Sequence, residues 1–388
     1  MLAWAPVLFQ SKLQVFDDVD ERLFHHPTIQ RFASQLPWPD LSDYPSATTP
    51  LYHLLMAPIS WATADNLTIL RLSNLLMSAL AIWLIVRTLS SWGRFATAWP
   101  CALIVALSPY FVGPAVRLST DNLALLGIAG ALAATHPSQQ KSAWRASGWA
   151  SVTIATRQIH AWVMLPLTIA AINARGKRST WLLISALPAA LLSFFLLTWG
   201  GLTPPSFAKG HTAAINLDVF LFILAILGTY GLFFSPWLIP ALRHRYSKQW
   251  VPGVIALTFA LMSVHQMPWV DDPNRWGGAI WSASKHVPLI LEVPITFWIT
   301  VPMGALTLLA FAFHPRKQHG HFLFIVSAAW LVANLVSARA YQKYYDPMSL
   351  FLLGAFVQGH PEASKWKWLG PALLIAGLVL VTTKRFYL

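Results

Sequence analysis

Charged residues are scarce in this sequence. Asp, Glu, Lys and Arg make up 11% of the 388 residues, whereas about a quarter of a typical soluble domain is charged. Hydrophobic residues make up 56%, and Trp occurs 20 times. Because a soluble surface needs charge, this composition disfavours a soluble enzyme, a nucleic-acid-binding module and a disordered chain. It favours a polytopic membrane protein.

Cysteine and long polar linkers are also nearly missing. Cys101 is the one cysteine and lies in an apolar run, so an intramolecular disulfide and a thiolate metal cluster are excluded. Since no long polar linker divides the chain, we expect residues 1–388 to form a single transmembrane domain. No internal repeat and no corresponding pair of broken helices is evident, although such pairs are typical of transporters.

Apolar runs near the length that spans a bilayer recur along the chain. They predict an all-α membrane protein, a polytopic bundle of about 10–13 transmembrane or re-entrant helices. The candidate spans are 67–87, 96–113, 119–135, 180–199, 217–240, 251–270, 288–313, 321–338, 346–358 and 368–383. The stretch 149–172 is also apolar.

The formal net charge of +13 comes largely from short loops between the apolar runs. Basic residues in short loops mark the cytoplasmic side of a membrane protein. Six loops hold 14 of the 27 basic residues and one acid, Glu362, so we expect all six to be cytoplasmic. They are 87–95, 136–148, 173–179, 241–250, 314–320 and 359–367.

This orientation places both flanks of 149–172 in the cytoplasm, so the stretch cannot cross the membrane once. We expect a hairpin of two short or re-entrant helices with its tip at 157–160. The alternative is a single span with one basic loop on the wrong side. The opposite face then collects 13 of the 14 acids and the first extracytoplasmic loop, 10–66. Lys384 and Arg385 fall on this outer face and are exceptions to the rule that basic residues mark the cytoplasmic side.

The first outer loop carries four carboxylates within residues 17–21, followed by His25 and His26. Such carboxylates serve as a general base, as metal ligands, or simply to solvate a loop. The spacing matches no metal motif, so no cofactor is predicted, although a divalent cation is compatible with the residue types.

Cations and aromatic residues mark the other outer loops. Arg157 lies in an apolar stretch, where its planar donor fork suits a phosphate unless it snorkels or is paired internally. Further phosphate candidates are Lys209, His211, Arg339 and Lys343. Asp272, Trp276 and Trp281 suit a sugar, because sugar CH faces stack on indole rings and hydroxyls bond to carboxylates. Membrane anchoring is the alternative for the aromatic residues.

Under the predicted topology, all these loops share one face. A carboxylate base with cations and aromatics fits sugar transfer from a polyprenyl phosphate, since the leaving phosphate needs cationic stabilisation and the acceptor hydroxyl needs a base. A nucleotide-sugar donor fits less well, because no Gly-rich phosphate loop follows a strand.

Motifs spread over residues 17–285 resemble those of a known family. The motifs are Asp20-Glu21, Phe24-His25, Thr48-Thr49-Pro50-Leu51-Tyr52, Arg157-Gln158, Trp199-Gly200-Gly201 and Asp272 with Asn274-Arg275. In this order they resemble the dolichyl-phosphate-glucose-dependent α-1,2-glucosyltransferases, polytopic enzymes of the C-type (GT-C) glycosyltransferase fold that add the terminal glucose to the lipid-linked oligosaccharide. The sequence departs from the family at Ala208, where Asp is expected, at the inserted Pro273, and at Trp276, where His is expected.

The resemblance implies an inverting transferase that moves a hexose, glucose by resemblance, from a polyprenyl-phosphate donor to a glycan or lipid-linked acceptor outside the cytoplasm. Asp20 is then the candidate base, and Glu21 is the second candidate or an acceptor contact. Gln158 and Arg275 join the phosphate candidates. His25, Thr48, Thr49, Tyr52 and Asn274 join the sugar and acceptor candidates, with helix capping as the alternative for the two Thr.

The chain is shorter than the eukaryotic members of that family, which favours a prokaryotic plasma membrane over the endoplasmic reticulum. The expected partners are the donor, the acceptor and membrane lipid, without nucleic acid. A transporter or flippase for a lipid-linked or small polar substrate is the alternative function, with Arg71 and Arg157 as its midplane charges. A structural membrane subunit without catalysis is a second alternative.

Overall fold

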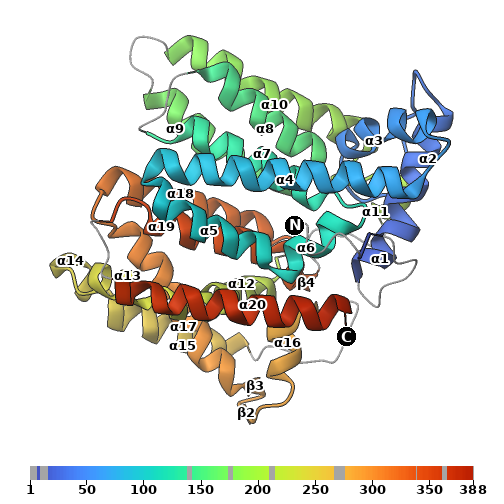
Figure 1. Ribbon diagram of the computed structural model, residues 1–388. Helices are drawn as coiled ribbons and strands as arrows, with labels where there is room; N and C mark the ends of the chain where they lie inside the picture. The colour runs from blue at the N-terminus through green and yellow to red at the C-terminus, as the bar shows by residue number, and fades with distance from the viewer. Residues whose placement is uncertain are drawn as a thin grey trace. The chain divides into compact units, whose positions relative to one another are not determined.

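The structure is a computed structural model, and its regular elements are almost all helical (Figure 1). It describes residues 7–8, 16–137, 142–173, 178–208, 215–265, 276–337, 339–360 and 365–387. The strands in these residues are short pieces of two residues each. The predicted all-α class is therefore confirmed.

The apolar helices make this an integral, multi-pass membrane protein. Among the described residues, four helical stretches are long and apolar enough to cross a membrane: Leu67–Trp92, Ser179–Trp199, Ile295–Ala312 and Lys365–Phe386. Two helix pairs meet the same criterion but are bent, by 66° at Ser108 and by 103° at Phe234. Shorter apolar helices accompany them.

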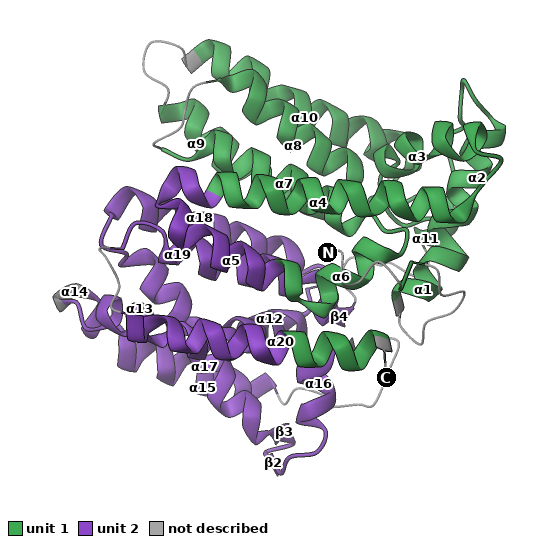
Figure 2. Ribbon diagram, viewed as in Figure 1, with its two compact units in different colours: residues 1–88, 106–212, 379–388 green, residues 89–105, 213–378 purple. Residues whose placement is uncertain are grey.

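Contacts divide the chain into two compact units (Figure 2). Unit 1 comprises residues 1–88, 106–212 and 379–388, and unit 2 comprises 89–105 and 213–378. The expectation of a single transmembrane domain stays a prediction.

Unit 1 contains the first loop and the helices that follow it. Its elements are α1 (Phe16–Asp20), η2 (Glu21–His25), α2 (His26–Ser34), α3 (Leu51–Ala62), α4 (Leu67–Trp92), α6 (Pro109–Val116), α7 (Asp121–Thr135), α8 (Ala143–Thr156), η3 (Gln158–Val163), α9 (Met164–Asn173), α10 (Arg178–Trp199) and α11 (Pro205–Ala208). Helix α4 runs on past Thr88, and the end of α20 (Leu369–Tyr387) also belongs to this unit.

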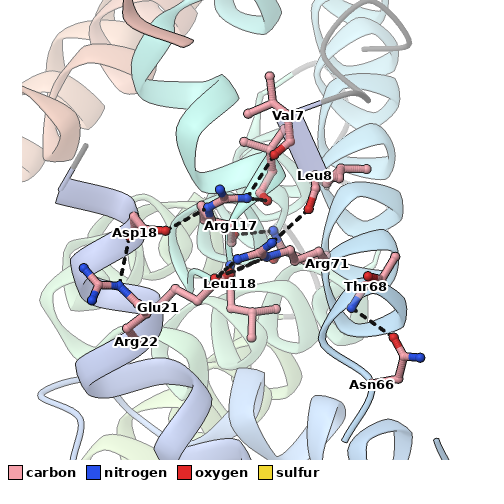
Figure 3. Close-up of polar contacts among 12 residues, drawn as sticks. Val7, Leu8, Asp18, Glu21, Arg22, Asn66, Thr68, Arg71, Arg117 and Leu118 are labelled. Atoms are coloured by element: carbon pink, nitrogen blue, oxygen red, sulfur yellow. Dashed lines mark hydrogen bonds and ion pairs between the residues drawn. The ribbon is translucent and has the colours of Figure 1, made fainter. Parts of the chain in front are cut away.

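Local sequence explains where several of these helices begin and break. Asn66 starts α4, because its Oδ1 accepts hydrogen bonds from the backbone N–H groups of Thr68 and Ile69 at 3.1 and 3.3 Å (Figure 3). Arg157 interrupts the apolar stretch 149–172, since its backbone is extended (φ −151°, ψ 112°) between α8 and η3. The break lies within the predicted tip at 157–160, and α9 packs against α8 and α10.

Unit 2 is built around the contact between α12 and α17. Its elements are α5 (Phe95–Leu107), α12 (Leu217–Phe233), α13 (Ser235–Leu242), α14 (Arg245–Lys248), α15 (Val251–His265), β1 (Trp276–Gly277), α16 (Ala279–Ser284), β2 (Leu289–Ile290), β3 (Val293–Pro294), α17 (Ile295–Ala312), α18 (Lys317–Asn334), β4 (Ala340–Tyr341), η4 (Gln342–Tyr344), α19 (Asp346–Val357), η5 (Lys365–Trp368) and most of α20. Gly228 and Gly304 let the α12 and α17 backbones touch, because a Cβ on either would collide with a backbone carbonyl of the other helix.

One predicted span begins later than the apolar pattern indicates. The run 288–313 was expected to be one helix, but α17 starts at Ile295. Before it, β2 and β3 form an antiparallel hairpin whose turn residues Leu291 and Glu292 have φ values of 49° and 63°. A two-residue turn with positive φ suits a hairpin and is incompatible with a right-handed helix.

Candidate functional site

The acidic segment of the first loop is largely committed to buried ion pairs inside unit 1 (Figure 3). Both carboxylate oxygens of Glu21 accept hydrogen bonds from Nε of Arg71, at 3.2 and 3.1 Å. The backbone N–H of Leu118 donates to the same carboxylate at 2.8 Å. Arg71 also donates from Nη1 to the carbonyl of Leu8 at 2.8 Å. Glu21 is therefore enclosed by donors that join η2 to α4 and to the loop before α7.

Asp18 and Asp17 are buried in ion pairs as well. Asp18 accepts from Nε of Arg117 at 3.3 Å and from Nε of Arg22 at 2.9 Å. Asp17 pairs with Nη2 of Arg385 at 3.1 Å. This last pair gives a physical reason for the exception at Arg385 in the predicted topology, since an acidic residue of the first loop neutralises its charge.

Asp20 differs from its acidic neighbours in burial. Asp17, Asp18 and Glu21 are 2%, 1% and 0% exposed, whereas Asp20 is half-buried. A general base has to reach the proton that it removes. Of the two carboxylates predicted to act as the base, Asp20 keeps access from outside the protein.

Gln158 joins the first loop to the loop that follows Trp199-Gly200-Gly201. Its Nε2 donates to the carbonyls of Ala47 and Leu202, both at 2.7 Å, and its Oε1 accepts from the backbone N–H of Thr49 at 3.1 Å. The Thr49 hydroxyl donates to the carbonyl of Ile154 at 2.6 Å. Thr49 and Gln158 thus meet, and their side chains hold the loops of unit 1 together.

Arg157 forms an ion pair with Asp121 in the first turn of α7. The two side chains are 16% and 15% exposed. Internal pairing lowers the cost of an arginine in an apolar stretch. A phosphate that bound Arg157 would have to share it with Asp121.

His25, Tyr52 and His53 form a buried cluster in unit 1. Nδ1 of His25 and Nε2 of His53 are 3.1 Å apart in a hydrogen bond, and the two rings stack with centroids 5.3 Å apart. The Tyr52 hydroxyl donates to Oδ1 of Asn74 at 3.0 Å and accepts from the Ser119 backbone N–H at 3.2 Å. Burial, and then the neighbouring His25, hold the pKa of His53 well below its usual value. His53 is therefore neutral at pH 7.

Thr48 and Trp199 anchor the polar end of the first loop. The Tyr44 hydroxyl donates to the carbonyl of Thr48 at 2.6 Å, and the hydroxyls of Thr48 and Ser46 are 3.1 Å apart. Nε1 of Trp199 donates to the carbonyl of Leu41 at 2.9 Å. These contacts fix the loop against the end of α10.

In unit 2, the segment around Trp276 meets the loop that begins at Arg339. Strand β1 pairs in parallel with β4, with Trp276 opposite Ala340 and Gly277 opposite Tyr341. A Cβ at Gly277 would lie 2.8 Å from the Tyr341 ring, so glycine permits this approach. Two of the predicted site segments therefore come together.

A buried polar network fixes η4 in the same loop. Nε2 of Gln342 donates to Asp346 Oδ1 at 2.9 Å and lies 3.2 Å from the Tyr230 hydroxyl, which itself hydrogen-bonds to Asp346. Oε1 of Gln342 accepts from the backbone N–H of Ile280 at 3.0 Å. A buried carboxylate that receives several hydrogen bonds makes a rigid support for the residues beside it.

Lys343 lies on this support and is 7% exposed, with Nζ 5.3 Å from the Tyr344 ring centroid. Trp281, in α16, is 4% exposed, and Nζ of Lys285 lies 5.6 Å from its ring centroid. Arg339 is half-buried. Unit 2 therefore carries predicted phosphate cations and a predicted sugar contact, and unit 1 carries the acidic residues.

The remaining predicted site residues lie outside the described residues. They are Lys209, His211, Asp272, Asn274 and Arg275. Within the described part of the chain, no group of three or more His, Cys, Asp or Glu is placed to hold a metal ion.

Sequence reasoning missed the arginine partners of the acidic segment. It also missed the buried contact of Asp346 with Gln342 of η4. Arg71 entered only as the midplane charge of a transporter, and Arg117 and Tyr230 did not enter at all. The signal for Arg71 is its position in an apolar run, because such an arginine needs a carboxylate partner. For Tyr230 and Asp346 we find no signal in the sequence.

No family model matches the chain. No curated protein matches it either. Among solved structures, the crystal structure of ArnT from Cupriavidus metallidurans in the apo state aligns with 92% of this chain and 75% of its own chain, at 14% sequence identity and a TM-score of 0.43.

Proposed function

We propose that the protein is an inverting glycosyltransferase of the C-type fold. It moves a hexose, glucose by resemblance, from a polyprenyl-phosphate donor to a glycan or lipid-linked acceptor on the extracytoplasmic face of the membrane. The observation that carries the proposal is the burial pattern of residues 17–21, in which Asp20 is half-buried while the other three carboxylates are buried.

In the proposed reaction, Asp20 accepts the proton of the acceptor hydroxyl. The acceptor oxygen forms a bond to the anomeric carbon as the bond from that carbon to the phosphate oxygen breaks. Polyprenyl phosphate leaves with the electron pair. Its developing negative charge requires stabilisation by cations.

The finer assignment is to the dolichyl-phosphate-glucose-dependent α-1,2-glucosyltransferases, and the proposed location is a prokaryotic plasma membrane. The motif order over residues 17–285 supports the family. The hydrogen bond from the Thr49 backbone N–H to the Gln158 side chain adds support, since it joins residues of two of those motifs.

Sugar transfer by purified protein in detergent tests the proposal. The donor is polyprenyl phosphate carrying labelled glucose, and a pool of lipid-linked glycans is the acceptor. We expect Asp20→Asn to lower transfer by about 10²-fold or more, the usual contribution of a general base, with an unchanged melting temperature. Asp40→Asn, at an exposed acid of the same loop, is the matched control and should transfer normally.

Equal transfer by wild type and Asp20→Asn would remove Asp20 as the base. If wild-type protein transfers none of a panel of polyprenyl-phosphate sugars, the enzyme proposal is wrong, and the transporter alternative becomes the better one.

A further inference from the structure

An Asp–His pair in unit 2 is not among the residues assigned above. His265 ends α15, and its Nε2 lies 2.6 Å from Oδ1 of Asp218 in the first turn of α12. The side chains are 26% and 10% exposed. Because Nε2 faces the carboxylate, Nδ1 is the ring nitrogen that this pair leaves for another contact.

Hydrogen bonds tie this pair to the segment that leads into the predicted phosphate loop. Asn216 caps α12 by accepting from the Asp218 backbone N–H at 3.1 Å. The Asn216 backbone N–H donates to the Leu335 carbonyl at 2.7 Å, and its Nδ2 donates to the Ser337 carbonyl at 3.2 Å. The Ser337 hydroxyl donates to the carbonyl of Arg339 at 3.0 Å. The pair and Arg339 are therefore connected through neighbouring hydrogen bonds.

Asp218 lies in the first turn of α12 and His265 in the last turn of α15, so both side chains stand at helix ends. A histidine that directs Nε2 at a carboxylate can offer its other ring nitrogen, Nδ1, to a phosphate oxygen.

A second Asp–His pair, in unit 1, shows a different arrangement. Asp65 accepts from His26 at 3.0 Å, from Gln30 at 2.5 Å and from Ser60 at 2.8 Å. These bonds join α2 to the end of α3. This pair has the form of a structural clamp and provides a matched control.

We propose that His265, oriented by Asp218, binds the phosphate of the lipid-linked substrate through Nδ1. The inference rests on the proposed function, because it adds a residue to the donor site of that reaction. Asp218 is a positioning residue, which holds the ring with Nδ1 directed away from the carboxylate.

Binding of polyprenyl phosphate to the purified protein in detergent tests the inference without requiring transfer. We expect His265→Gln to weaken binding at least tenfold and Asp218→Asn to weaken it severalfold, while His26→Gln binds as wild type does. In the transfer assay, the KM for the donor should rise in His265→Gln, whereas the KM for the acceptor stays the same. A purely structural role would not separate the two constants.

The outcomes distinguish this inference from the proposed function. If wild type transfers sugar and His265→Gln binds polyprenyl phosphate equally well, the inference is wrong and the function stands. If His265→Gln and His26→Gln weaken binding alike, the effect is general destabilisation and the inference is again wrong. If wild type neither binds polyprenyl phosphate nor transfers sugar, both are refuted.

Discussion

The buried pair of Glu21 and Arg71 allows a sharp test of which carboxylate is structural. The side chains of Glu21 and Arg71 are 1% and 5% exposed. Glu21→Gln removes the negative charge and turns an amide N–H₂ toward donors on Arg71 or Leu118. Removing one partner of a buried ion pair costs about 3–5 kcal/mol, because the other charge stays buried and uncompensated.

For Glu21→Gln we expect the free energy of unfolding to fall by about 3 kcal/mol, at the lower end of this range, since glutamine keeps one acceptor oxygen. One kcal/mol shifts the melting temperature of a protein of 150–250 residues by about 2–4 °C, and less for a longer chain. Glu21→Gln should therefore melt roughly 5 °C below wild type. Tryptophan fluorescence during heating in detergent measures this shift.

A second variant separates lost pairing from lost packing. Replacing both partners of a buried pair by apolar residues is often nearly neutral, so Glu21→Leu with Arg71→Met should melt closer to wild type than Glu21→Gln does. Asp40→Asn is the matched control, because Asp40 is 51% exposed and contacts Arg31 at 3.5 Å, and it should melt with the wild type. If Glu21→Gln melts at the same temperature as wild type, the Glu21–Arg71 pair does not stabilise the fold.

Two further predictions concern unit 2. Gly304→Ala should lower the melting temperature in the same assay, because its Cβ would collide with the Leu224 carbonyl on α12, whereas Gly253→Ala, with nothing within 4 Å, should not. Burial, with the neighbouring His319 and His360, lowers the pKa of His314 to about 3, whereas an unfolded histidine has a pKa of about 6.5. The unfolded chain therefore binds more protons between these values, so stability should fall as the pH is lowered from 7 to 5; an unchanged melting temperature over that interval would contradict the burial of this imidazole.

The sequence by itself determined the class of the protein and the approximate course of its helices. Low charge and long apolar runs indicate a chain that lies in a membrane. Inside a bilayer, a helix satisfies the backbone hydrogen bonds of such a run within the run itself. The break at Arg157 was also predictable, because basic flanks on both sides of 149–172 favour a hairpin over a single crossing. The start of α17 was not predictable. The hairpin turn before it is formed by Leu291 and Glu292, and it lacks the glycine or asparagine that usually marks such a turn in a sequence.

Only the tertiary structure decided which acidic residues are buried in pairs. Asp17 meets Arg385, 368 residues away, and Glu21 meets Arg71, 50 residues away. Local sequence does not identify such partners, because the residues around a carboxylate are the same whether or not an arginine from a distant helix pairs with it. Burial is a property of the packed chain, and it separates Asp20 from its neighbours because packing alone decides which of the four carboxylates within residues 17–21 is covered.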